Sequence, residues 1–261
     1  MWRELAMPQL GSLPAEVRKI CQYGFTEMLN NAVDHSEGTR VGCLVEASAL
    51  GVQMVVQDDG VGIFRKIRES LRLSDDRDAI LQLSKGKLTT DPSSHTGQGI
   101  FFSSRVFDEF AIVSHALSFL HLPNNSDWLV EDTDDREGTM VNMKIDIDSP
   151  RTLNQVFDQY SSKDGDYAFT VTHVPVGLVR YGEENLISRS QAKRLLTRIE
   201  AFREVVLDFA GVEAIGQAFA DEVFRVFTRE HPEIHVRFVN AAPDVEKMIR
   251  RATSPGTAPA D

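Results

Sequence analysis

Glu27 and Asn31 are the residues of this chain whose types and spacing most directly suggest chemistry. They lie four positions apart within residues 24–36, so a helix there would place both side chains on one face. An amide oxygen can ligate the hard cation Mg²⁺, while a carboxylate can orient a water molecule or accept its proton. On its own the pair fits a solvated helix face better than a site, so its meaning depends on the motifs downstream.

An acidic pair followed by two glycines is the second stretch of interest. Residues 57–63 read Gln-Asp-Asp-Gly-Val-Gly-Ile and follow a run of β-branched residues. Glycine permits conformations and close approaches that other residues do not, so Gly60 and Gly62 could bring backbone against a bound molecule. Taken alone, the stretch fits a tight acidic turn better than a ligand site.

A long charged segment leads to a second pair of glycines. Residues 64–96 contain two short helical patterns and end in small polar residues with two lysines, Lys85 and Lys87. Long loops in compact domains are often lids, so we expect this segment to be a mobile lid. Gly97 and Gly99 then open into an apolar periodic segment. The free amides and positive dipole end of such a helix accept phosphate.

The elements that position these residues follow from the apolar periodicity. Apolar residues at spacings of three and four predict a helix over residues 15–35, with Pro14 at its start. Residues 1–12 form a short lead-in. Runs of β-branched and alternating residues predict strands at 41–46, 52–56, 110–114, 128–131 and 139–145. The last of these strands opens with Gly138-Thr139, and the first domain spans residues 13–147.

Composition limits the class of function. A chain of 261 residues fits two domains, and its net charge of −11 argues against a nucleic-acid-binding surface. The two cysteines, Cys21 and Cys43, lie in apolar patterns without metal-ligand spacing, so we expect buried, reduced thiols. We find no signal peptide and no long apolar run, so we expect a cytoplasmic protein that does not enter a membrane.

The pattern restarts after Pro150. Residues 148–167 are expected to form a linker that includes a helix-like stretch. Residues 168–252 alternate strands with helices, which predicts a small α/β domain. Its predicted strands are 169–176, 205–209 and 235–239, and its predicted helices start after Ser188 and cover 215–228 and 245–251. The small, Pro- and Gly-rich residues 253–261 predict a disordered tail.

In their order, the motifs of the first domain resemble those of the GHKL (Bergerat-fold) ATPases. This family includes type II topoisomerases, heat-shock chaperones, histidine kinases, mismatch-repair ATPases and anti-sigma serine kinases. The resemblance covers about residues 13–147. The family's Glu-x-x-x-Asn-Ala, Asp-x-Gly-x-Gly, second glycine box and late Gly-Thr are similar to residues 27–32, 58–62, 97–100 and 138–139.

The resemblance implies an α+β fold, in which a Bergerat-fold α/β sandwich ATPase domain precedes a small α/β STAS-like domain. It also implies ATP and Mg²⁺ as cofactors. Asn31 would ligate Mg²⁺, and Glu27 would be the general base. Asp58 would accept a hydrogen bond from the adenine amino group, with Thr139 near the same edge of the base.

The glycines acquire roles from the same resemblance. Gly60 and Gly62 would let backbone approach the nucleotide, and Gly97 and Gly99 would cradle its phosphates at a helix start. We also expect a lysine on the lid, Lys85 or Lys87, to reach the γ-phosphate. That last expectation rests on charge and position and has no match in the family.

A closer resemblance joins both halves of the chain. Residues 24–31, 85–92 and 99–102 are similar to bacterial ATP-binding proteins that carry a STAS-like domain of unknown function, and the second half resembles that domain. In related anti-sigma-factor antagonists, a GHKL kinase phosphorylates a serine at the start of the helix after the central strand. The corresponding residues 212–219 contain no Ser or Thr, so we expect no phosphorylation of this domain in cis. The alternative is that Ser188 or Ser190, at a helix start, serves as the acceptor.

The second half also carries a basic helix face. Its members are Arg189, Lys193, Arg194 and Arg198. Such a face is usually a solvated helix side. The alternative is a docking surface for an acidic partner or for the nucleotide domain.

We therefore expect an ATP- and Mg²⁺-dependent switch in bacterial signalling or gene regulation, coupled in cis to a STAS-like partner-binding domain. Its activity would be that of a slow Mg²⁺-dependent ATPase, because binding alone would not need the Glu27 carboxylate. One alternative is an anti-sigma-type serine/threonine kinase that acts on a separate antagonist. Another is a nucleotide-binding scaffold without turnover. Expected partners are a protein such as a sigma-factor-type regulator and a second copy of the chain, with no membrane and no nucleic acid.

Overall fold

The computed structural model describes residues 2–11, 13–88, 97–123, 126–133, 135–161, 168–182 and 184–254. The chain divides into two compact units, Met1–Ala168 and Phe169–Asp261. Most of the predicted tail lies outside the described residues. In the described part of the chain, no helix is long and apolar enough to cross a membrane.

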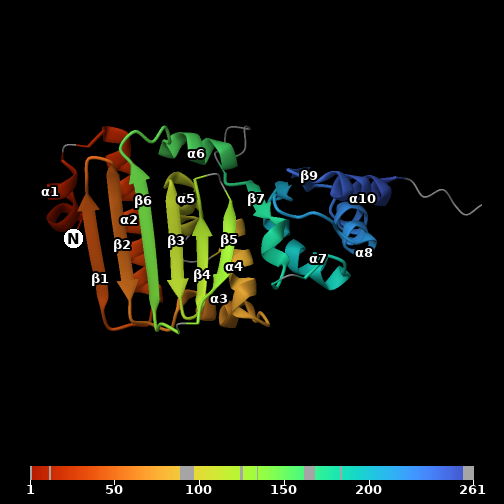
Figure 1. The fold of residues 1–261 in the computed structure, drawn as a ribbon, viewed down its shortest axis with the longest axis horizontal. Helices are drawn as coiled ribbons and strands as arrows, with labels where there is room; N and C mark the ends of the chain where they lie inside the picture. The colour runs from red at the N-terminus through yellow and green to blue at the C-terminus, as the bar shows by residue number, and fades with distance from the viewer. Residues whose placement is uncertain are drawn as a thin grey trace, which may run out of the picture. The chain divides into compact units, whose positions relative to one another are not determined.

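The first unit is built on a six-stranded antiparallel sheet (Figure 1). Its spatial order, β1-β2-β6-β3-β4-β5, places the last strand of the sequence between the second and the third. The strands are β1 (Val41–Ala47), β2 (Gly51–Asp58), β3 (Glu109–Ser114), β4 (Leu117–His121), β5 (Asp127–Glu131) and β6 (Thr139–Asp146). Asp58 pairs with Thr139, so two motifs 81 residues apart in the sequence meet at one end of the sheet.

The helix α2 (Ala15–His35) has the bounds that the apolar spacing predicts. It packs against the sheet through apolar residues at helical spacing, among them Ile20, Phe25 and Met28. Figure 1 shows α2 and α5 (Gly99–Val106) on the same face of the sheet. The lead-in forms η1 (Trp2–Ala6) and α1 (Met7–Leu10), and the Trp2 and Phe25 ring centroids are 5.6 Å apart.

The predicted lid contains two helices, α3 (Ile63–Leu71) and α4 (Asp76–Lys85). The Asp75 side chain caps α4 by accepting a hydrogen bond from the Arg77 amide. Residues 89–96, the part of the lid with the fewest apolar residues, lie outside the described residues.

Another helix, α6 (Leu153–Tyr160), occupies the stretch that we assigned to the linker. It packs on α5 through aromatic rings, with centroid distances of 4.6 Å for Phe102–Phe157 and 4.9 Å for Phe101–Tyr160. The first unit therefore extends to Ala168, further than the predicted limit at residue 147.

The second unit contains a three-stranded parallel sheet in the order β7-β8-β9. Its strands are β7 (Val171–Pro175), β8 (Glu204–Asp208) and β9 (His235–Val239). Its helices include α7 (Arg189–Leu196), α8 (Gln217–Asp221), η4 (Glu222–Phe227), α9 (Thr228–Glu230) and α10 (Pro243–Thr253). Ser188 and Gln191 form a capping box at the start of α7, as its position before the apolar stripe predicts.

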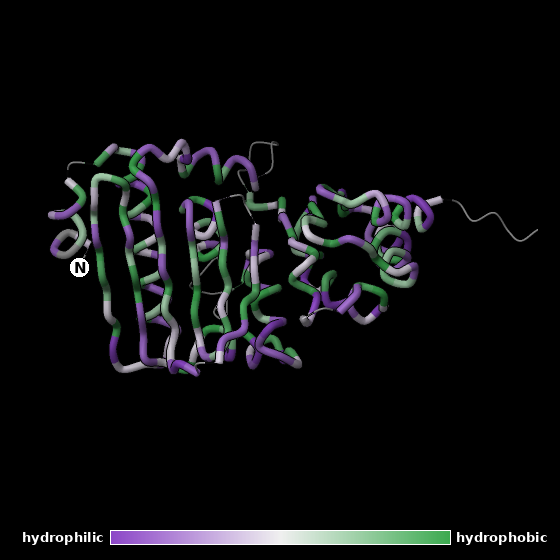
Figure 2. The backbone as a smooth tube through the Cα atoms, viewed as in Figure 1, coloured by the Kyte–Doolittle hydropathy of each residue, from purple (hydrophilic) through white to green (hydrophobic). Residues whose placement is uncertain are grey.

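Each unit has its own apolar core. Phe25, Phe101 and Phe110 are among the buried side chains of the first unit, and Leu207, Phe209 and Phe219 are among those of the second. Hydrophobic residues recur along the strands, whereas residues 132–133 and 135–137, which connect β5 to β6, are hydrophilic (Figure 2).

Candidate functional site

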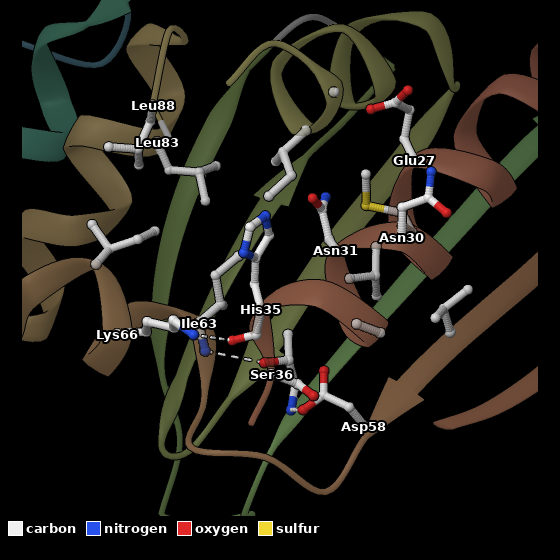
Figure 3. A pocket seen from close by; sticks show the side chains of 18 of the residues that line it. Glu27, Asn30, Asn31, His35, Ser36, Asp58, Ile63, Lys66, Leu83 and Leu88 are labelled. Atoms are coloured by element: carbon white, nitrogen blue, oxygen red, sulfur yellow. Dashed lines mark hydrogen bonds between the residues drawn. The ribbon is translucent and has the colours of Figure 1, made fainter. Parts of the chain in front are cut away.

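A cavity of about 310 Å³ lies among α2, α3, α5 and the β2 and β6 strands of the first unit (Figure 3). Its volume is at the lower end of the range for small-molecule sites. Seven of the ten site residues predicted from the sequence line it, namely Glu27, Asn31, Asp58, Gly62, Gly97, Gly99 and Thr139. The cavity thus brings together four segments that are distant in the sequence.

The polar residues of α2, Glu27, Asn30, Asn31 and His35, form one wall of the cavity. Figure 3 shows Glu27 toward one end of the pocket, Asp58 toward the other and Asn31 between them. The last turn of α2 reaches the Asp58 end, because the Val61 amide donates to the Ser36 carbonyl at 2.9 Å. Nine residues of helix between Glu27 and Ser36 span roughly 13 Å. The cavity can therefore hold an elongated ligand with two chemically different ends.

The Glu27 carboxylate lies against the first residue of α5. A Cβ built on Gly99 would overlap Oε2 of Glu27, so a larger residue there would displace the carboxylate. Unpaired amides at a helix N-terminus favour a negative charge. The same feature makes this end of the cavity suitable for an anionic ligand group.

Buried ionic contacts anchor α5 at its other end. Arg105 donates to Asp127 on β5 at 2.8 Å, and both side chains are almost fully buried. His121 also contacts this carboxylate at 2.5 Å. Burial by itself would raise the pKa of Asp127, but the neighbouring Arg105 charge and the hydrogen bonds outweigh it and lower that pKa. These contacts hold the C-terminal end of α5, the helix that begins at Gly99, in the core.

The Asp58 side chain closes the opposite end of the cavity. Its Oδ1 accepts hydrogen bonds from the Gly60 amide at 3.0 Å and the Thr139 amide at 3.2 Å. The residue is only 7% exposed. Burial raises the pKa of Asp58 above its usual value, the two amides oppose this, and the charge of Asp59 adds to it. Among the described residues no hydrogen bond reaches Oδ2, so this oxygen can accept from a ligand.

Asp59, the second member of the acidic pair, has a structural role instead. Its Oδ1 accepts from the Thr39 and Arg40 amides at 2.7 and 2.9 Å, and its Oδ2 accepts from the Thr39 hydroxyl at 2.9 Å. These hydrogen bonds lower the pKa of Asp59. The two neighbouring carboxylates therefore have different tasks, one in the cavity and one at the start of β1.

The two glycines after Asp58 are needed for close packing. A Cβ on Gly60 would overlap the Ser36 carbonyl oxygen, although Gly60 itself does not line the cavity. Gly62 has φ 87°, and a Cβ there would come within 2.6 Å of Ser114 Oγ. The Thr139 hydroxyl accepts from the Ile63 amide at 3.0 Å, which joins the start of β6 to the start of α3.

Lys85 and Lys87, the lysines expected to reach the γ-phosphate, do not line the cavity. Lys85 is the last residue of α4, is fully buried and donates to Gln82 Oε1 at 3.2 Å. Lys87 precedes Leu88, whose amide donates to the Gly97 carbonyl at 3.1 Å. Gly97 adopts φ 65°, and a Cβ there would lie about 2.5 Å from Leu88 backbone. In the described conformation neither lysine is therefore among the residues that line the site.

Sequence reasoning missed four polar residues that line the cavity: Asn30, His35, Ser36 and Lys66. Lys66, on the first turn of α3, donates to the His35 carbonyl and to Glu37 Oε1, the latter at 2.9 Å. A lysine beside the last carbonyls of a helix is favoured by the helix dipole. The sequence signal that could have identified Lys66 is its position four residues after Gly62, because this spacing places a cation one helical turn from the glycine motif.

Comparison with known proteins bears on the second unit. Residues 191–246 match the family model described as STAS-like domain of unknown function (DUF4325). That range runs from α7 through β8 and β9 to the first turn of α10. A search of curated proteins finds no match to this chain.

A search of solved structures returns the crystal structure of the N terminal domain of a DNA repair protein. It is 11% identical with a TM-score of 0.32, over 51% of this chain and 40% of that chain. This likeness is too slight to carry an argument, and the chain spans less than half of that structure. The family match makes the C-terminal unit a STAS-like domain, joined to an α+β unit that carries the cavity.

Proposed function

We propose that the first unit binds ATP with Mg²⁺ as a GHKL-type, Bergerat-fold ATPase domain. We further propose that nucleotide state controls what the STAS-like unit binds. The observation that carries the proposal is the convergence of four ordered motifs, from α2, the β2–α3 connection, the start of α5 and the start of β6, on one cavity. Short motifs of this kind can occur in a sequence by chance, but chance matches would seldom also lie around one cavity.

The Asp58 end suits an adenine base. Met28, Ala32 and Val141 contribute apolar surface to the cavity, and apolar walls suit the faces of a purine. Within them, the Oδ2 atom of Asp58 would accept a hydrogen bond from the amino group of the base. A carboxylate that accepts from a neutral donor forms a stronger hydrogen bond than a neutral acceptor does.

The Glu27 end suits the phosphates and the metal. Backbone of Gly97 and Gly99 at the start of α5 would face the phosphates. Among the described residues no cluster of three His, Cys, Asp or Glu could hold a metal alone. Mg²⁺ does not need such a cluster, because it usually takes one or two protein oxygen ligands together with phosphate oxygens and water. The side-chain oxygen of Asn31 would be the protein ligand, and Glu27 would orient or deprotonate the attacking water.

A kinase that transfers phosphate to its own STAS-like unit is less favoured. The helix that follows β8 starts at Gln217 with Gly216 as its N-cap, so no hydroxyl stands at the position phosphorylated in the antagonists. Transfer to a separate antagonist remains the alternative function, and the Glu27 carboxylate serves hydrolysis and transfer equally well.

Calorimetry tests the binding proposal. We expect the full chain to bind ATP with Mg²⁺ and to lose binding with EDTA. Asn31→Ala should abolish binding, while Asn142→Ala should not, because Asn142 contacts Gln53 outside the cavity. Absence of ATP binding by the parent chain would refute the proposal. Unchanged binding by Asn31→Ala would remove Asn31 from it.

Incubation with γ-labelled ATP separates switch from kinase. Release of free phosphate, without label on residues 169–254, supports a switch with ATPase activity. Stoichiometric label on those residues by mass spectrometry would favour the kinase, and bound ATP without turnover would favour the scaffold.

A further inference from the structure

The tight turn between β3 and β4 contains a residue that such turns seldom use. Ser114 pairs with Leu117, so His115 and Ala116 form a two-residue hairpin loop. His115 has φ 54°, a conformation that favours glycine or asparagine in these loops. A bulky residue in such a conformation costs free energy and often marks a function. Its side chain is therefore of interest.

The His115 ring bridges two oxygen acceptors. Its Nδ1 lies 2.8 Å from Oδ1 of Asp135, and its Nε2 lies 3.1 Å from the Val61 carbonyl oxygen. A carbonyl oxygen only accepts, and an ionised carboxylate also only accepts. Both ring nitrogens must donate to satisfy both contacts, so this arrangement fits the doubly protonated ring.

The bridge reaches the wall of the cavity. Val61 and Gly62 line it, and the Val61 amide is already held by the Ser36 carbonyl at 2.9 Å. His115 therefore holds the same peptide segment from the opposite side. The ring also packs on Gly62, since a Cβ there would come within 2.8 Å of His115 Nε2.

We infer that His115 is a positioning residue for the nucleotide site, fixing the Val61–Gly62 backbone where the ligand needs it. This inference rests on the proposed function. Loss of the ring removes its contacts with Asp135 and with the Val61 carbonyl and loosens the loop. Nucleotide affinity should therefore fall when His115 is replaced.

Carboxylates outnumber cations around the ring. The charged residues of the elements packed against it are Asp132, Asp135, Arg136 and Glu137 in the β5–β6 connection and Asp58 and Asp59 in the β2–α3 connection. On the hairpin itself, Glu109 and His121 lie at the far ends of the strands. Asp135 is the one in direct contact.

The test variant is His115→Gly, because glycine accepts the turn conformation while the bridge is lost. The melting temperature should not fall. Without nucleotide, amide protection factors at residues 61–63 should drop about tenfold, the effect of losing one hydrogen bond to a charged donor. ATP affinity should fall about as much. Arg72→Gly is the matched control, since Arg72 also has positive φ but does not line the cavity.

A second variant tests the charge. Asp135→Asn keeps an oxygen that can accept from Nδ1 but removes the negative charge, so protection at residues 61–63 and ATP affinity should fall less than in His115→Gly.

The role of His115 and the proposed ATP binding can be refuted independently. Unchanged protection factors at residues 61–63 in His115→Gly would overturn the role of His115. If protection drops but the parent chain binds no ATP, the loop contact stands and the proposed function fails.

Discussion

Asp58→Asn is the substitution that most directly tests how the cavity recognises a base. It preserves the size of the side chain and replaces one oxygen by an amino group. The Gly60 and Thr139 amides can only donate, and both donate to Oδ1 of Asp58. They will therefore hold the oxygen of the new amide side chain in the Oδ1 position and leave its amino group in the position of Oδ2.

The magnitude follows from that orientation. A hydrogen bond to a charged group contributes about 1.5–3 kcal/mol, which corresponds to roughly 10–150-fold in affinity. The variant loses this hydrogen bond and places the amino group of its side chain opposite the adenine amino group. ATP affinity should therefore fall by at least roughly 10-fold. Inosine triphosphate has a carbonyl in place of the amino group and could accept from the new donor. Its affinity relative to ATP should rise.

The stability of the nucleotide-free protein should change in the opposite direction. Burial raises the pKa of Asp58, so the folded state binds this proton more tightly than the unfolded state. The folded state therefore loses stability as pH rises from the ordinary carboxyl pKa through the raised one, and the cost persists at pH 7. Asparagine carries no charge, so Asp58→Asn should melt no lower than the parent at pH 7.

Calorimetry with both nucleotides and thermal melting without them measure these effects. Asp59→Asn is the matched control, because the neighbouring carboxylate binds Thr39 and Arg40 outside the cavity. ATP affinity should be unchanged in the control. The reasoning is refuted if Asp58→Asn binds ATP like the parent, or if it loses both nucleotides equally and melts lower.

Three further outcomes are expected. Glu27→Gln should bind ATP within about twofold of the parent but lose roughly 10²–10⁴ in phosphate release, because the amide cannot take a proton; an unchanged rate would exclude Glu27 from the mechanism. Gly99→Ala should slow phosphate release more than it weakens binding, since its methyl group would displace Glu27 Oε2, and a parental rate would contradict this contact. Hydrogen exchange at residues 83–88 should slow when a non-hydrolysable ATP analogue binds, because Leu83 and Leu88 line the cavity, and equal protection in both states would count against a closing lid.

Patterns of neighbouring residues in the sequence predicted those elements that depend on neighbouring residues alone. The α2 helix could be predicted because apolar side chains recur at helical spacing and Pro14 suits its start. The glycines near Asp58 could be predicted as points of close approach because few other residues fit there. Their convergence on one cavity is a property of the strand order, which places β6 beside β2, and no local pattern in the sequence encodes that order.

The assignment of residues 153–160 to a linker, although they pack on the first unit, has a different explanation. Residues 153–160 have an amphipathic helical pattern followed by polar residues, which fits a linker as well as a packed helix. The helix α6 is held by Phe157 and Tyr160, whose rings meet Phe101 and Phe102 on α5. That partner lies far earlier in the chain, and periodicity describes only neighbours.

The lysines show why charge and position alone do not identify a phosphate ligand. Lys85 lies beside Gly86 in a polar segment, yet the phase of α4 turns it into the protein interior. Lys66 lines the cavity, but its ammonium group already pairs with the His35 carbonyl and with Glu37. Among the described residues, no other lysine or arginine lines the cavity. In the proposed function, neutralising the phosphates of ATP would therefore depend on Mg²⁺ and the amides at the start of α5, and Asn31 would be the residue on which binding most depends.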